Sequence, residues 1–225
     1  MRRLLKFIFI KIPVWFLIVS LALVVALKWI PVRFTPLMAK RAVEYRSDDV
    51  YCRHQIWTPV EKVSEPYLKA IIAAEDSRFF SHNGFEKGGI QNEFERFKNG
   101  DTNIRGCSTI SQQTAKNVFT LGSSTWFRKG IEAYYTFLIE KIWGKRRILE
   151  VYVNVAEMGK GLYGVQSAAE YYFHIDAKHL TMADASSLAV CLPCPLKRTP
   201  EGVNKHFSKR RNQIAKDANT IKIQF

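Results

Sequence analysis

The sequence predicts a mainly α-helical protein in which one domain follows an N-terminal helix that spans a membrane. Three observations support this fold class. An uncharged apolar run covers residues 12–27. After residue 60, apolar residues recur at the three- and four-residue spacing of helices, and segments that alternate as strands do are few. The length of 225 residues suits a single domain with an appendage.

Residues 1–32 are expected to form a short cytoplasmic tail followed by an uncleaved signal anchor. The apolar run continues past Lys28 to Val32, which brings it close to the ~20 residues that a spanning helix needs. Lys28 can extend its ammonium group to the interface. Trp15 and Trp29 lie near the two ends, where aromatic anchors are common. A buried core helix fits less well because charged residues flank the run.

A cleaved signal peptide is the alternative to the anchor. The small residues Ala22 and Ala26 do not have the A-x-A-like spacing of a cleavage site, so the anchor is favoured. Basic residues stand on both sides of the run, and their count therefore barely distinguishes the two orientations.

Residues 33–60 are interpreted as a connector because prolines interrupt them, and residues 61–225 as the main domain. Ser64 is a candidate N-cap for the first helix of the domain. Thr125 could cap a long helix that ends near Gly144. Further helices are expected at 147–157, at 163–174, after a capping box at 181–184, and at 204–216.

Composition narrows the classes of function. The formal charge of +14 favours anionic partners such as nucleic acid, anionic lipid or a phosphorylated substrate. Hydrophobic residues at 47% exclude a disordered chain. Four cysteines are too few for a disulfide scaffold in a chain of this length. Structural thiols, or at most one local disulfide, are expected.

Glu75 is the first residue that points to chemistry. It follows Ile71 by four residues and Ile72 by three, so on a helix it shares their apolar face. Burial there would raise the pKa of the carboxyl group and make it a candidate base or acid near neutral pH. A core glutamate paired with a cation explains the position equally well.

Two further clusters are polar. Residues 106–117 are rich in hydroxyl and amide groups and end in a cation; such a stretch can donate hydrogen bonds to sugars or phosphate oxygens, or simply begin a surface helix. Arg128 and Glu132 stand four residues apart on one helix face. Sequence alone favours a surface ion pair there, worth ~0.3–0.5 kcal/mol.

In this order, the clusters resemble the motifs of glycosyltransferase family 51, the peptidoglycan glycosyltransferases. Three motifs are unbroken: E-D-x-x-F-x-x-H-x-G at 75–84, G-x-S-T-I-x-Q-Q-x-x-K-N at 106–117 and R-K-x-x-E at 128–132. A fourth, at 145–154, has Tyr-Val-Asn where the family usually has Tyr-Leu-Asn, and a fifth, at 183–195, is looser. The resemblance covers about residues 60–200 and implies a lysozyme-like helical fold. S-x-x-K, the nucleophile motif of the transpeptidase domain in the larger relatives, does not occur in this sequence. In this respect the chain resembles the monofunctional members of the family, which have no transpeptidase domain.

The resemblance implies polymerisation of lipid II, a disaccharide-peptide on undecaprenyl diphosphate, into β-1,4-linked glycan with inversion. By motif match, Glu75 is the base that deprotonates the 4-hydroxyl of the acceptor sugar. Lys116 and Arg128 would stabilise the departing diphosphate. Glu132 is the second carboxylate, which orients the substrate or assists departure. Six more residues are expected to shape the substrate site: Asp76, Phe79, His82, Thr109, Gln113 and Asn117.

The resemblance also bears on ligands and location. No cofactor is expected, no cluster requires a resident metal, and a divalent cation on the substrate diphosphate stays open. Expected partners are lipid II, the growing strand and membrane lipids, with the cell-wall synthesis machinery as a further candidate and no nucleic acid. The domain is expected on the outer, periplasmic side of a bacterial cytoplasmic membrane, where a tether raises the effective concentration of a lipid-linked substrate. Four apolar residues resemble the membrane-facing segment of the family, although the core would explain them as well: Phe119, Leu121, Trp126 and Phe127.

Two other classes of function compete with this interpretation. A lysozyme-like glycan hydrolase also uses carboxylates on a helical fold, but it would not need the cations Lys116 and Arg128. A membrane-anchored basic protein that only binds nucleic acid or anionic lipid would not need Glu75. The size of the product distinguishes a polymerase from a glycan hydrolase. A Glu75 variant distinguishes an enzyme from a protein that only binds.

Overall fold

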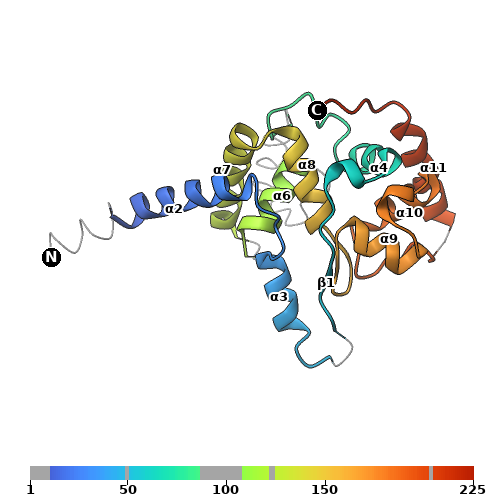
Figure 1. Cartoon of the computed structure of the whole chain (residues 1–225), viewed down its shortest axis with the longest axis horizontal. Helices are drawn as coiled ribbons and strands as arrows, with labels where there is room; N and C mark the ends of the chain where they lie inside the picture. The colour runs from blue at the N-terminus through green and yellow to red at the C-terminus, as the bar shows by residue number, and fades with distance from the viewer. Residues whose placement is uncertain (1–10, 49–50, 87–107, 122–124, 203–204) are drawn as a thin grey trace, which may run out of the picture.

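The computed structural model describes residues 11–48, 51–86, 108–121, 125–202 and 205–225. Within them the protein is mainly α-helical, as predicted, with one small sheet beside the helices (Figure 1). The helices are α2 (Ile12–Leu27), α3 (Pro36–Glu44), α4 (Glu65–Glu75), α6 (Ile110–Phe119), α7 (Trp126–Ile142), α8 (Gly144–Val155), α9 (Val165–Phe173), α10 (Met182–Cys191) and α11 (Lys205–Ala218), with short 3₁₀ turns at Val60–Lys62 and Ala177–His179.

Helix α2 projects from the body of the molecule, and its C-terminal part packs against α7 (Figure 1). The indole nitrogen Nε1 of Trp143 donates a hydrogen bond to the carbonyl oxygen of Val24 (2.7 Å), and the hydroxyls of Ser20 and Tyr134 lie 2.7 Å apart. The helix ends at Leu27, earlier than the predicted span. Among the residues described, no helix has both the length and the apolar character that crossing a membrane requires.

The segment interpreted as a connector contains regular structure. Thr35 caps α3 by accepting a hydrogen bond from the backbone N–H of Met38. Strand β1 (His54–Gln55) then pairs in parallel with β3 (Leu162–Tyr163), which pairs antiparallel with β2 (Glu157–Gly159). The sheet order is β1-β3-β2, so residues just before α4 are joined to the main domain by backbone hydrogen bonds.

Asn154 fastens this segment to α8. Its side chain is fully buried, and its Nδ2 donates to the carbonyl oxygens of Thr58 and Glu150, at 2.8 Å each. Its Oδ1 accepts from the backbone N–H of Thr58 at 2.7 Å. Gly164 packs on the Asn154 backbone with φ of +80°, where a Cβ would lie 2.7 Å from the carbonyl oxygen of Asn154. Only glycine combines that conformation with that approach.

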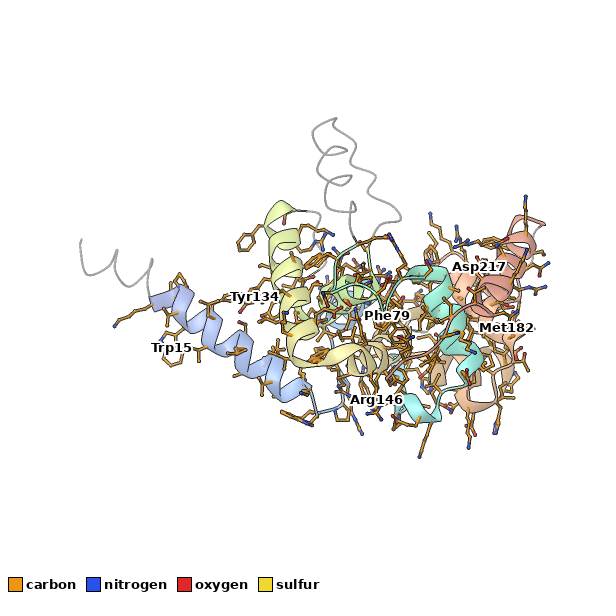
Figure 2. All side chains as sticks on the ribbon, turned by 90° about the horizontal axis from the view of Figure 1, so that it is seen from above. Trp15, Phe79, Tyr134, Arg146, Met182 and Asp217 are labelled. Carbon is orange, nitrogen blue, oxygen red and sulfur yellow. The ribbon has the colours of Figure 1, made fainter. Side chains whose placement is uncertain are left out.

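The core is one cluster of buried side chains that includes residues of α4, α6, α8 and α10. Helix α4 packs against α10 and α11, and α6 packs against α7 and α8. Phe79, just after α4, is fully buried and lies in the middle of the body in Figure 2. The start of α6 lies beside the end of α4, because the backbone N–H of Ile110 donates a hydrogen bond to the side chain of Asp76, 34 residues earlier in the sequence.

Most predicted boundaries are confirmed. Ser64 caps α4, Thr125 caps α7, and Thr181 forms a capping box with Asp184. Helix α7 ends at Ile142 with Trp143 as its C-cap, close to the predicted Gly144. Helix α8 begins at Gly144, whose φ is +75°, rather than at Arg147. Of the predicted range 163–174, the first residue belongs to β3 instead of α9.

Thiols agree with the structural interpretation. Cys52, Cys191 and Cys194 are free in the described part of the chain, and Cys107 lies outside it. Burial raises the pKa of the Cys191 thiol to about 11, so this cysteine stays protonated and unreactive at neutral pH.

Replacing Asn154 by Ala tests how strongly the β1 segment depends on the hydrogen bonds of the Asn154 side chain. The change leaves both backbone groups of Thr58 without their partner and should lower the free energy of unfolding by about 2–4 kcal/mol. Chemical denaturation of the detergent-solubilised chain measures it. Asn219→Ala, at an exposed site after α11, is the control with no such loss. Equal denaturation midpoints for the two variants would contradict a stabilising role of the Asn154 hydrogen bonds.

Candidate active site

Glu75 ends α4, and its surroundings act on its carboxyl group in opposite directions. Burial is the largest influence and raises the pKa of the carboxyl group. The amide nitrogen Nε2 of Gln113 donates a hydrogen bond to Oε2 of Glu75 at 2.8 Å, which favours the ionised form. Lys116 and Arg210 favour it electrostatically. The predicted direction of the shift is confirmed: the pKa of Glu75 lies above its usual value.

Asp76 and its neighbours join the first motif to the start of α6. One oxygen of Asp76, Oδ2, accepts hydrogen bonds from the backbone N–H of Ile110 (3.0 Å) and from Nε2 of His82 (2.9 Å). Thr109, the N-cap of α6, donates from its hydroxyl to the carbonyl oxygen of Gly84 at 2.7 Å. These residues were predicted to shape the substrate site; in the structure their hydrogen bonds form a layer that supports the start of α6.

Phe79 belongs to the same supporting layer. It is fully buried, and the ammonium group of Lys145 lies 4.6 Å from the centre of its ring. Lys145 also pairs with Glu140 at 2.7 Å, and Glu140 accepts a short hydrogen bond from the hydroxyl of Ser111 on α6. The ion pair therefore links α7, α8 and α6 beneath the site.

Glu132 lies inside the protein and not on its surface. Glu132 is 3% exposed, so the surface ion pair that the sequence alone favours is wrong. Arg128 contacts one carboxylate oxygen at 2.6 Å, and Lys129 contacts the other at 2.8 Å. The packing of α6 against α7 buries this pair. A buried carboxylate between two cations is suited to hold them in place.

Lys116 and Arg128 both have a group that can receive an anion. Lys116 is exposed to solvent, yet the protein around its ammonium group lowers its pKa, with Glu132 and Glu75 opposing that change. The guanidinium nitrogen Nε of Arg128 is buried and has no hydrogen-bond partner among the residues described. A buried donor without a partner favours a bound acceptor such as a phosphate oxygen.

The structure thus brings together five of the predicted residues: Glu75, Gln113, Lys116, Arg128 and Glu132. Asp76, Phe79, His82 and Thr109 lie in the supporting layer. Asn117 is half-buried on α6, and within the described ranges no hydrogen bond ties its side chain to this group.

Three further residues reach the site and were not among the predicted ones. Lys129 is the second cation on Glu132. Tyr152 donates from its hydroxyl to Oε1 of Gln113 at 3.3 Å. Arg210, on α11, contacts the carbonyl oxygen of Ala74 at 3.4 Å and acts on Glu75. Lys129 and Tyr152 stand within recognised motifs, whereas Arg210 is hidden among the basic residues of the tail.

The arrangement combines one base with a cation cluster. The raised pKa of Glu75 makes its carboxylate a stronger proton acceptor than an ordinary glutamate, and Lys116, Arg128 and Lys129 can stabilise negative charge on an oxygen. Within the described ranges, no three His, Cys, Asp or Glu side chains gather closely enough to hold a metal ion. The chemistry that fits is transfer to a hydroxyl nucleophile with an anionic leaving group.

Comparison with known proteins gives the family. A family profile described as Transglycosylase matches residues 22–219. A biosynthetic peptidoglycan transglycosylase of Caulobacter vibrioides is 42% identical over 98% of this chain and 94% of its own. Proteins of the same name from Pseudomonas putida and Pseudomonas aeruginosa are 40% and 43% identical over 92% and 87% of this chain, and 88% and 82% of theirs. The chain therefore belongs to the transglycosylase family of peptidoglycan glycosyltransferases.

Proposed function

We propose that the chain polymerises lipid II into β-1,4-linked glycan strands for the bacterial cell wall. The observation that carries the proposal is the position of Glu75, a carboxylate with a raised pKa, beside the cations Lys116, Arg128 and Lys129. Family membership supports the same activity. The growing strand is the donor, and lipid II is the acceptor.

Glu75 acts as the general base in this reaction. It takes the proton of the acceptor 4-hydroxyl while that oxygen forms a bond to the anomeric carbon of the donor sugar. The bond between that carbon and the diphosphate oxygen breaks, and undecaprenyl diphosphate leaves with the electron pair. Attack from the opposite face inverts the anomeric centre. The raised pKa suits the task because a base works best when its pKa lies near the operating pH.

The cation cluster stabilises the departing diphosphate. Lys116 is open to solvent, and Nε of Arg128 has no hydrogen-bond partner in the part of the chain that the structure describes, so both can bind phosphate oxygens. Glu132 fixes Arg128 and Lys129 through two ion pairs, and we assign it a positioning role rather than proton transfer. A divalent cation that accompanies the diphosphate would belong to the substrate and not to a protein site.

A glycan hydrolase is the competing function, and the cation cluster favours transfer over hydrolysis. Three cations around a buried carboxylate serve a diphosphate leaving group, which a finished glycan does not have. A protein that binds anionic lipid without catalysis would gain nothing from a carboxylate held beside its cations.

We also propose that the N-terminal segment anchors the enzyme in the cytoplasmic membrane, with the domain on the periplasmic side. Side chains along α2 are apolar and exposed, among them Ile18 and Leu21, which are 53% and 46% exposed. Leu121 and Phe127 are also exposed and suit contact with lipid, whereas Phe119 stacks on Tyr135 in the interior. Such apolar surface is unfavourable in water.

Glu75→Gln should reduce polymerisation by about 10²–10⁴-fold because the amide cannot accept the proton. The measurement is the length and amount of glycan made from purified lipid II. Glu65→Gln, at an exposed site in the first turn of the same helix, is the matched control and should keep full activity. Long glycan made by the Glu75 variant would refute the assignment of Glu75 as the base. Shortening of finished glycan by the wild-type protein would favour the competing hydrolase function.

Lys116→Gln should lower kcat/KM by about 10²–10³-fold, since one charged stabiliser of the leaving group is lost. Steady-state kinetics with lipid II measure the loss. Lys141→Gln, at an exposed site on α7, removes the same charge away from the cluster. If both variants lose activity equally, the overall charge matters and the site assignment is wrong.

The anchor is tested by placing lysines on α2. Ile18→Lys combined with Leu21→Lys should release the chain into the alkaline extract of membranes, because each lysine costs ~2.5–3.5 kcal/mol at the centre of a spanning helix. Tyr171→Lys with Leu196→Lys changes two exposed apolar residues elsewhere and should leave the chain in the pellet.

The side of the membrane on which the domain lies is tested by labelling exposed Cys52 with an impermeant maleimide on intact spheroplasts. We expect Cys52 to be labelled; protection of Cys52 would place the domain inside the cell.

A further inference from the structure

Gln113 stands between a buried phenol and the base. Its Nε2 donates to Oε2 of Glu75 at 2.8 Å and also contacts the carbonyl oxygen of Ser108 at 3.2 Å. Its Oε1 accepts from the hydroxyl of Tyr152 at 3.3 Å. Because the two acceptors face the nitrogen and the donor faces the oxygen, the three contacts specify one orientation of the amide.

The hydroxyl of Tyr152 stays protonated. It lies on α8, it is 2% exposed, and burial raises the pKa of its hydroxyl well above the usual value, with the nearby charge of Glu75 adding to the effect. The hydroxyl therefore keeps its proton at every pH at which the enzyme works. A hydroxyl that always carries its proton can donate it to the amide oxygen of Gln113, which is the contact that the structure shows.

We propose that Tyr152 is a positioning residue for the transfer reaction: its hydroxyl holds the Gln113 amide so that Nε2 faces Glu75. This inference rests on the proposed role of Glu75 as the base. Tyr152 does not touch the substrate in this scheme and acts only through Gln113.

The consequence falls on the ionisation of Glu75. Without the Tyr152 hydroxyl the amide oxygen loses its donor and the amide is held only at Nε2. The hydrogen bond from Nε2 to the carboxylate is then held less firmly, which disfavours the charged form of Glu75. The other titratable or charged groups acting on Glu75 are Asp76, Tyr67 of α4, Lys116 of α6 and Arg210 of α11. Helix α10 also packs against α4, but among the described residues none of its charged groups acts on Glu75. None of these contacts changes when Tyr152 loses one oxygen.

Tyr152→Phe is the direct test, with the pH dependence of kcat/KM for lipid II polymerisation as the readout. A base must be ionised to act, so the acid limb of the profile should move to higher pH by about one unit. On the acid side, kcat/KM should be about tenfold lower than in the wild type, and at pH values above the limb it should be near normal. Tyr163→Phe removes the same atom from another fully buried tyrosine, in β3, and should leave the limb in place.

A second variant shows whether the effect runs through Gln113. In a Gln113→Ala background, Tyr152→Phe should move the acid limb no further, because the amide it orients is gone. A Tyr152→Phe enzyme with an unmoved limb, or with a uniform loss at every pH, would overturn the inference and leave Tyr152 a packing residue. Failure of the proposed function has a different signature, since Glu75→Gln would then polymerise lipid II normally.

Discussion

The carboxyl group of Glu75 is held where burial and hydrogen bonding oppose each other, and the rest of the site is arranged around that balance. Burial raises its pKa, while Gln113, Lys116 and Arg210 keep the ionised form within reach. Because the native state holds the proton more tightly than the unfolded chain, the raised pKa costs no stability at low pH, where both states are protonated. The free energy of unfolding falls as pH rises from the ordinary pKa through the raised one. The same shift strengthens the carboxylate as a proton acceptor, which is what the proposed role of Glu75 requires.

Neighbouring carboxylates divide the work between chemistry and structure. Asp76 is one residue from Glu75, yet it binds the first N–H of α6 and the ring of His82, and so fixes the helix that carries Gln113. Glu132 is likewise structural, because its two oxygens hold Arg128 and Lys129 in one place. Only Glu75 keeps a carboxyl group that faces the cations without being paired to one at short range in the described residues. The geometry thus separates a proton acceptor from the groups that position it.

The helical class, the caps and the raised pKa of Glu75 could be predicted from sequence because each depends on local spacing. The burial of Glu132 could not, because it depends on the packing of α6 against α7, and the i,i+4 pattern of Arg128 is the same on a surface. Arg210 reaches Ala74 from 136 residues away, and no local pattern marks it. Residues 33–60 contain few periodic positions, so α3 and β1 depend on a cap and on pairing with β3.

Titration of the Glu75 carboxyl group itself tests the central claim most directly. Infrared difference spectra of the wild-type protein against Glu75→Gln, recorded across pH with ¹³C-labelled glutamate, isolate its carboxylate band. We expect the band to appear at a pH clearly above the ordinary glutamate pKa of about 4.3. A carboxylate that is already fully ionised at or below that pH would contradict a buried base held against its cations.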